Sequence, residues 1–168
     1  HAEGIPAERI HLVGNTMIDT LVALEPRFRN AGAAEKLGVE PGSFVLVTLH
    51  RPALVDGPLL AETIERLAAL AREMPVIFPV HPRTRAMMEA IDSEHPGLLL
   101  CEPLGYLDFL SLLADARAVL TDSGGIQEET TYLGIPCFTL RDNTERPITI
   151  TSGTNTMIGL DHVSYTNL

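Results

Sequence analysis

The chain has 168 residues, of which 45% are hydrophobic, and its 12 basic and 22 acidic residues give a net charge of −10. This length and composition predict a single domain over residues 1–168 that buries roughly 70% of the unfolded surface. The acidic balance disfavours nucleic acid and anionic membranes as partners. No apolar run reaches membrane-spanning length and the first residues do not form a signal peptide, so we expect a cytoplasmic protein. Cys101 and Cys137 lie in apolar surroundings and are expected to be reduced core residues.

Apolar segments of strand length alternate along the chain with segments of helical periodicity. The first strand is expected at residues 9–13, and Gly14 to Thr16 then form a turn and a helix cap. Residues 30–42, rich in Ala and Gly, are expected to be a linker. The segment 44–49 is almost continuously apolar, as in a strand buried on both faces. Further strands are expected at 76–80, 98–101, 116–120, 136–140 and 154–158, and helices at 17–28, 59–73, 83–91, 106–114 and 126–133.

This alternation predicts an α/β fold, a doubly wound and mainly parallel sheet with helices on both faces. In such sheets ligands bind beyond the carboxyl ends of the strands. The three-glycine dinucleotide fingerprint and the Walker loop are both missing, which disfavours nicotinamide cofactors and ATP hydrolysis. The polar residues expected at the strand ends are His50 and Arg51, His81, Glu102, Asp122 to Gly125, and Arg141 with Asp142.

The segment 120–129 reads as a strand, a tight turn and a helix. Gly124 and Gly125 allow the backbone to approach a bulky group, and Ser123 is suited to cap the helix. The N–H groups and the positive end of the helix dipole then favour a phosphate. Glu128 and Glu129, one turn later, are candidates for the hydroxyls of a ribose. As a pattern alone, the segment also fits a tight turn with an ordinary helix cap.

Several segments together resemble the non-hydrolysing UDP-N-acetylglucosamine 2-epimerases, in the order and spacing of that family. They are residues 14–19, 48–52, 80–85, 103–109, 120–129, 141–147 and 153–155. The resemblance implies a Rossmann-like domain that forms the second half of a glycosyltransferase-B-type, two-domain protein. It implies the interconversion of UDP-N-acetylglucosamine and UDP-N-acetylmannosamine by elimination and re-addition of UDP, for cell-surface polysaccharide precursors.

The resemblance also implies that neither a metal nor a cofactor is needed. The carboxylates that move the proton at sugar C2 would lie in an N-terminal domain that this chain lacks, so we expect the chain alone to be inactive. The full-length protein is expected to be a homodimer. Three alternatives remain open: a hydrolysing epimerase, a glycosyltransferase of the same architecture, and a domain that binds UDP-sugar without catalysis.

The family's functional residues map onto matching positions of this sequence. His50 would contact the diphosphate or sugar and stabilise the leaving UDP as a catalytic residue. Phe109 would pack on uracil, although core packing also explains it, and Leu104 would contribute only its backbone. His81 and Glu128 are secondary candidates, since a rigid turn at Pro82 explains His81 equally well. The full set expected to bind UDP is His50, Arg51, Leu104, Phe109, Ser123, Gly124, Gly125, Glu129 and Arg146.

Two features qualify this assignment. Arg141, Glu145 and Arg146 would also be explained by a surface ion-pair network. Ala53 and Leu54 stand where the family usually has a polar pair ending in asparagine. The loss of that amide removes a hydrogen-bonding group near His50, which puts full activity or regulation in doubt more than nucleotide binding.

Overall fold

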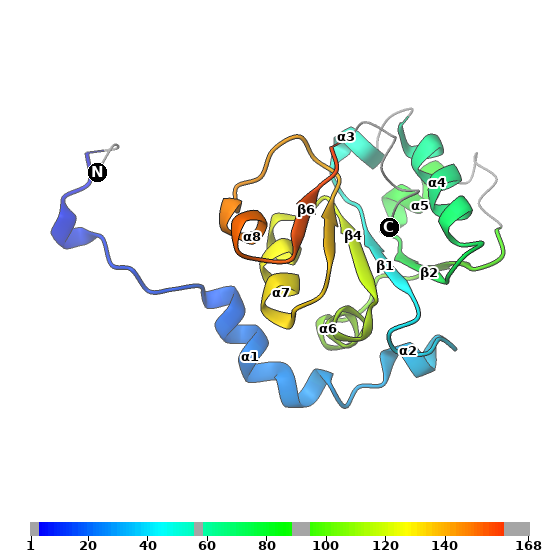
Figure 1. Ribbon diagram of the computed structural model, residues 1–168, viewed down its shortest axis with the longest axis horizontal. Coiled ribbons are helices and arrows are strands. Elements are labelled where there is room, and N and C mark those ends of the chain that lie inside the picture. The colour runs from blue at the N-terminus through cyan, green and yellow to red at the C-terminus, as the bar shows by residue number, and fades with distance from the viewer. Residues whose placement is uncertain (1–3, 56–58, 89–94, 160–168) are drawn as a thin grey trace.

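The computed structural model describes residues 4–55, 59–88 and 95–159. Within these ranges the chain forms a six-stranded parallel sheet in the order β3-β2-β1-β4-β5-β6. Helices cover both faces of the sheet (Figure 1). This arrangement confirms the predicted doubly wound α/β fold, because the chain starts in the middle of the sheet and winds outwards in both directions. The strands are β1 (Val45–Thr48), β2 (Val76–Pro79), β3 (Leu98–Cys101), β4 (Ala118–Thr121), β5 (Cys137–Thr139) and β6 (Asn155–Met157).

The helices match the predicted ones within a few residues at each end, apart from three short helices, α2 (Ala33–Lys36), α3 (Pro52–Val55) and α8 (Pro147–Thr151), that were not predicted. The others are α1 (Thr16–Phe28), α4 (Leu59–Leu70), α5 (Pro82–Met88), α6 (Tyr106–Asp115) and α7 (Gly124–Leu133). The last residues of the helix predicted at 83–91 lie outside the described part of the chain.

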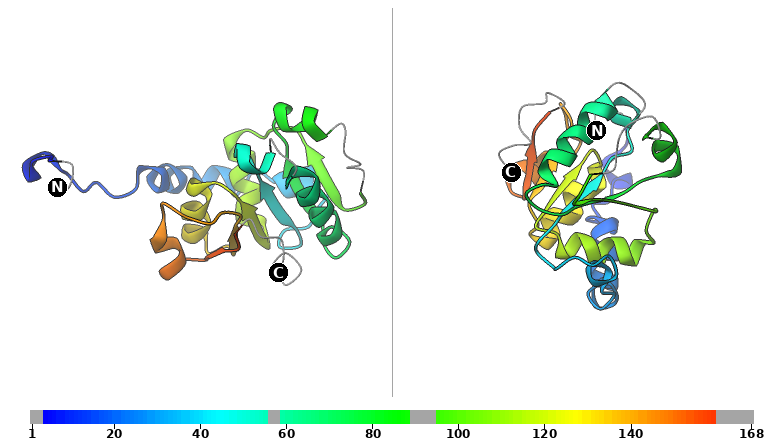
Figure 2. Two further views of the ribbon diagram at one scale, coloured as in Figure 1. Left: turned by 90° about the horizontal axis from the view of Figure 1, so that it is seen from above. Right: turned by 90° about the vertical axis from the view of Figure 1, so that its right-hand side faces the viewer.

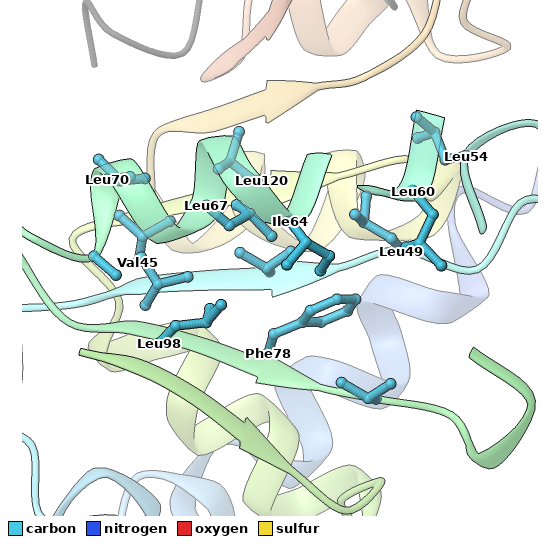
Figure 3. Close-up of a cluster of buried hydrophobic side chains, with 14 of the residues drawn as sticks. Val45, Leu49, Leu54, Leu60, Ile64, Leu67, Leu70, Phe78, Leu98 and Leu120 are labelled. Carbon is cyan, nitrogen blue, oxygen red and sulfur yellow. The ribbon is translucent and has the colours of Figure 1, made fainter. Parts of the chain in front are cut away.

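One face of the sheet packs against α4 (Figure 3). Ile64 and Leu67 point from this helix onto Val45 and Phe78 of the sheet, and all four are at most 2% exposed. The apolar residues of α4 recur three and four positions apart, so one stripe of the helix is buried. Burying an aliphatic or aromatic side chain of this size contributes about 1.5–3 kcal/mol, which makes this layer a large part of the fold's stability.

The other face packs against α1, α2 and α6 through Phe28, Ala33 and Leu113, which are buried against Phe44 and Leu46 of the sheet. Alternate residues of the β1 segment therefore face opposite layers, as expected for a strand. Both layers are apolar, which explains why the segment 44–49 is an unbroken hydrophobic run.

The predicted strand at residues 9–13 is wrong. The chain forms a short 3-10 helix, η1 (Ala7–Arg9), and an arm without secondary structure, which lie away from the sheet and lead into α1 (Figures 1 and 2). Leu12 is fully exposed and Val13 is 70% exposed. A strand requires a neighbour for its backbone N–H and C=O groups, and within the described residues the arm has no strand beside it.

The predicted linker at residues 30–42 is also partly wrong, because it contains the helix α2. Ala33 and Ala34 are almost fully buried, and the backbone N–H of Ala33 donates to Ser111 Oγ on α6 at 3.3 Å. Small side chains here allow the chain to pack closely against α6. The alanines thus serve packing, where their abundance had suggested a loop.

Of the two cysteines expected in the core, Cys137 is buried and Cys101 is partly buried. Cys101 and Cys137 are both free, and burial raises the pKa of each thiol. None of the described helices is long and apolar enough to span a bilayer.

Candidate functional site

The turn between β4 and α7 lies at the carboxyl edge of the sheet, as predicted. The helix α7 begins at Gly124, two residues earlier than expected, with Ser123 at the N-cap position. The Ser123 side chain does not cap the helix, so that part of the prediction is wrong; its backbone N–H instead donates to Thr121 Oγ1 at 3.0 Å. The first N–H groups of a helix have no acceptor within it, and the dipole makes this end positive. The turn therefore presents donors suited to an anion.

Both glycines of the turn are closely approached by other side chains. A Cβ placed on Gly124 would lie 3.4 Å from Glu145 Oε2, and one on Gly125 would lie 2.8 Å from the terminal methyl of Met17. A side chain at Gly125 would have to displace the Met17 methyl, whereas a Cβ at Gly124 would just touch the Glu145 carboxylate. Glycine therefore keeps the amino end of α7 open to close contact from two neighbouring segments.

The end of β1 is tied to the end of β4 through Asp122. The Asp122 side chain is fully buried, and its Oδ2 accepts the backbone N–H groups of His50 at 3.0 Å and Arg51 at 2.8 Å. Asp122 Oδ1 lies 2.8 Å from His50 Nδ1. The Nε–H of Arg51 returns a hydrogen bond to the Asp122 carbonyl at 3.0 Å. The sequence placed all three residues at strand ends but gave Asp122 no role.

Arg141 and Glu145 form a bidentate ion pair beside this junction, one of the outcomes considered from the sequence. Both guanidinium–carboxylate distances are 2.8 Å, and Arg141 is only 7% exposed, so the pair is not confined to the surface. Arg51 Nη2 lies 3.6 Å from the same carboxylate. The hydrogen bonds from Arg141 are the main reason that the pKa of Glu145 falls to about 2. Glu145 is therefore ionised at neutral pH.

Arg146 is attached to the same loop and faces α7. Its Nε lies 3.0 Å from Glu128 Oε2 but makes no hydrogen bond with it, so the pair is a charge contact without alignment. The loop is fixed to α7 by Thr144, whose hydroxyl donates to Gln127 Oε1 at 2.6 Å and accepts the Arg146 N–H at 2.9 Å. The buried side chain of Asn155 also donates to Gln127, so β6 supports this arrangement. Glu128 thus places a negative charge beside the Arg146 guanidinium.

A shallow pocket of about 170 Å³ opens between the ends of β1, β4 and β5. Leu54 forms an apolar part of its wall and is 2% exposed. Where the resemblance led us to expect an amide, the chain therefore has a core contact. The lining residues are Arg51, Leu54, Asp122, Leu140, Arg141, Asp142 and Asn143.

Glu129 is buried on α7, one turn beyond the glycines, where it accepts a hydrogen bond from the Tyr106 hydroxyl at 2.9 Å. Desolvation is the main cause that raises the pKa of Glu129, and the Tyr106 hydrogen bond opposes it. Desolvation and the negative charge of Glu129 raise the pKa of Tyr106 to about 12. Tyr106 was not recognised from the sequence, because only the fold brings α6 beside α7.

The remaining candidates lie further from this junction or share their surface with the core. Phe109 and Leu104 are partly buried and pack against the α1–α6 layer. Phe109 therefore does take part in core packing, as the alternative explanation required, but part of its ring stays exposed. His81 is exposed at the end of β2 and does not line the pocket.

Fold and site together define a Rossmann-like α/β domain with helix N–H donors and arginines at its carboxyl edge, a class that includes many nucleotide-binding domains. The family model described as UDP-N-acetylglucosamine 2-epimerase matches residues 1–165. The chain therefore belongs to the UDP-N-acetylglucosamine 2-epimerase family, as its motifs indicated.

Individual relatives agree with this family. The UDP-N-acetylglucosamine 2-epimerase of Methanococcus maripaludis is 36% identical over 98% of this chain and 48% of its own length. A UDP-2,3-diacetamido-2,3-dideoxy-D-glucuronate 2-epimerase of Pseudomonas aeruginosa is also 36% identical, over 91% of this chain and 42% of its length. A crystal structure of the Methanocaldococcus jannaschii UDP-GlcNAc 2-epimerase with UDP-GlcNAc and UDP matches with a TM-score of 0.81 and 37% identity, over 96% of this chain and 47% of that chain. The chain thus spans about half the length of the relatives it matches.

The buried carboxyl group of Glu129 predicts a specific pH dependence of stability. Its pKa is raised in the folded state from an ordinary value of 4.5, so the proton stabilises the folded chain and this contribution is lost as the pH rises through the folded pKa. The free energies of unfolding of the wild type and of Glu129→Gln should be measured in urea. Their difference should be constant below about pH 4.5 and should then grow in favour of the variant as the pH rises. A difference that stays constant as the pH rises further would contradict this assignment.

Proposed function

We propose that this chain is the UDP-binding domain of an enzyme that interconverts UDP-N-acetylglucosamine and UDP-N-acetylmannosamine. The observation that carries the proposal is the junction of β1, β4 and α7. There the amino end of an α-helix, two glycines and the cations Arg51 and Arg146 face one edge of the sheet. This combination suits a diphosphate, because it supplies N–H donors and positive charge in a chain whose net charge is −10.

The diphosphate is assigned to the turn that begins α7. The N–H groups of Gly124 and Gly125 would donate to its oxygens, together with the Ser123 hydroxyl, which the helix does not use as a cap. Arg51 and Arg146 would add guanidinium donors. Each already contacts a carboxylate, so phosphate oxygens would compete for an existing ion pair.

The uridine is assigned to the surface where α6 and α7 meet, beside Tyr106 and Glu129. Glu129 would accept the ribose hydroxyls, and the hydrogen bond from Tyr106 fixes the rotation of its carboxylate. The exposed part of the Phe109 ring would stack on uracil, with the backbone of Leu104 at the base edge. A ring that is half in the core is held rigidly, which favours stacking.

The whole protein's reaction requires more than this chain. His50 would stabilise the negative charge on the departing UDP, and the carboxylates that move the C2 proton would come from an N-terminal domain. The chain spans about half the length of its relatives, which supports such a second domain. The free cysteines fit the reducing cytoplasm. The homodimer stays a prediction, which sedimentation of the full-length protein would test.

The sugar is the least constrained part of this proposal. The chain is equally similar to an epimerase named for UDP-N-acetylglucosamine and to one named for a diacetamido glucuronate. Both share the UDP group that this site would bind. The second substrate is therefore the main alternative within the same reaction class.

Calorimetry with UDP on this chain tests the binding site. Arg146→Ala should weaken UDP binding about tenfold, because it removes a cation beside the phosphates. The matched control is Arg72→Ala, which removes an exposed arginine just before β2, at the opposite edge of the sheet. Equal losses in both variants would mean that overall charge, and not the site, governs binding.

Glu145→Gln should strengthen UDP binding severalfold while leaving uridine binding unchanged. The variant removes a negative charge that lies beside Gly124 and competes with phosphate for Arg51 and Arg141. Glu25→Gln is the control, because it breaks another i,i+4 ion pair with arginine, on α1. Weaker UDP binding by Glu145→Gln would show instead that the ion pair is needed to hold the loop in place.

Incubation of UDP-N-acetylglucosamine with the full-length protein in heavy water tests the reaction. Deuterium should appear at sugar C2, because elimination removes that proton and re-addition takes one from solvent. The diacetamido glucuronate substrate, tested in parallel, decides between the two sugars. Release of free UDP and N-acetylmannosamine would indicate a hydrolysing enzyme, and UDP-sugar binding without exchange would indicate a domain that only binds.

A further inference from the structure

Asp122 combines complete burial with contacts to an exposed side chain. Its carboxylate is 0% exposed, whereas the His50 side chain that it contacts at 2.8 Å is 59% exposed. Burying a carboxylate is costly unless it is fully hydrogen-bonded, and a neutral acceptor would serve two backbone N–H groups as well. The two backbone N–H groups therefore do not by themselves explain why a carboxylate is buried at this position.

The two carboxylate oxygens have different partners. Oδ2 accepts the backbone N–H groups of His50 at 3.0 Å and Arg51 at 2.8 Å. Oδ1 is the oxygen nearest to His50 Nδ1, and it makes only a longer contact of 3.3 Å with the His50 backbone N–H. One oxygen thus holds the end of β1, and the other holds the imidazole ring.

We propose that Asp122 is a positioning residue that keeps the proton of His50 on Nδ1 and directs Nε2 at the phosphate group next to the sugar. An ionised carboxylate accepts but cannot donate, and two lone pairs at 2.8 Å would repel each other, so the proposal places the ring hydrogen on Nδ1. Nε2, on the far side of the ring, is then the nitrogen that faces away from Asp122 and towards solvent. The role of Nε2 rests on the proposed function, whereas the state of Nδ1 does not.

The arrangement defines how the ring meets a phosphate. With Nδ1 protonated, a neutral imidazole presents a lone pair at Nε2, so donation to a phosphate oxygen requires uptake of a proton. The resulting imidazolium lies between two anions, Asp122 and the phosphate. The other charged groups around this junction are Arg51, Arg141, Glu145 and Asp142. Their charges balance, so a phosphate there would rely on direct contact with the two arginines.

The variant Asp122→Asn tests the roles of the two carboxylate oxygens separately, because it keeps one oxygen and replaces the other by an NH₂ group. The amide oxygen should replace Oδ2, where two N–H donors require an acceptor, and the NH₂ group should then face Nδ1. A donor at that place forces Nδ1 to accept and moves the ring proton to Nε2. The control is Asp115→Asn, which changes a carboxylate to an amide at the end of α6, just before the amino end of β4.

The ring nitrogen shifts of His50 should be measured by ¹⁵N NMR at about pH 8, where an ordinary imidazole is neutral. The wild type and Asp115→Asn should show the Nδ1–H tautomer, and Asp122→Asn the Nε2–H tautomer. Two results would overturn the proposal. The first is an Nε2–H tautomer in the wild type, and the second is an Nδ1–H tautomer that persists in folded Asp122→Asn.

Calorimetry in buffers of different ionisation enthalpy gives a second readout. The wild type should take up close to one proton on binding UDP at about pH 8, and Asp122→Asn and His50→Ala should take up almost none. Uptake that persists in Asp122→Asn would contradict the role of Asp122. Failure of the wild type to bind UDP would instead refute the proposed function, while the tautomer measurement would still decide the state of His50.

Discussion

The parallel pairing of β1 with β4 is the constraint on which the site depends. Thr48 lies opposite Thr121 in this register, so the residues that follow the two strands leave the sheet side by side. This pairing brings His50 within reach of Asp122 and places Arg51 beside the turn that begins α7. Both strands are buried between two apolar layers, so their positions are rigid. The core therefore fixes the geometry of the polar edge.

Three arginines gather at this edge although the protein is acidic. Arg51, Arg141 and Arg146 are each matched by a carboxylate, and the charge of Glu145 is shared between two of them. Such pairing avoids isolated charge in a partly buried place. A diphosphate carries the same charge type as Glu145, so it can take over the same cations with little rearrangement.

The sequence predicted the sheet well because apolar runs such as 44–49 report burial directly. It failed at residues 9–13, where an apolar pattern has no neighbouring strand, and at α8, whose β-branched residues after Pro147 do not suggest a helix. The strand–turn–helix at residues 118–133 was predicted from local glycine and helix signals, and its binding of phosphate stays a prediction. The role of Asp122 and the contact of Tyr106 with Glu129 depend on which strands and helices become neighbours, which local patterns do not encode.

Backbone amide shifts of this chain during a titration with UDP test the central claim most directly. The account predicts that the largest changes fall on Gly124, Gly125 and the residues that follow them in α7, with smaller changes at His50 and Arg51. Changes concentrated at the opposite edge of the sheet, around Arg72 and Gly97, would contradict it. So would an absence of change at the glycines when UDP is bound.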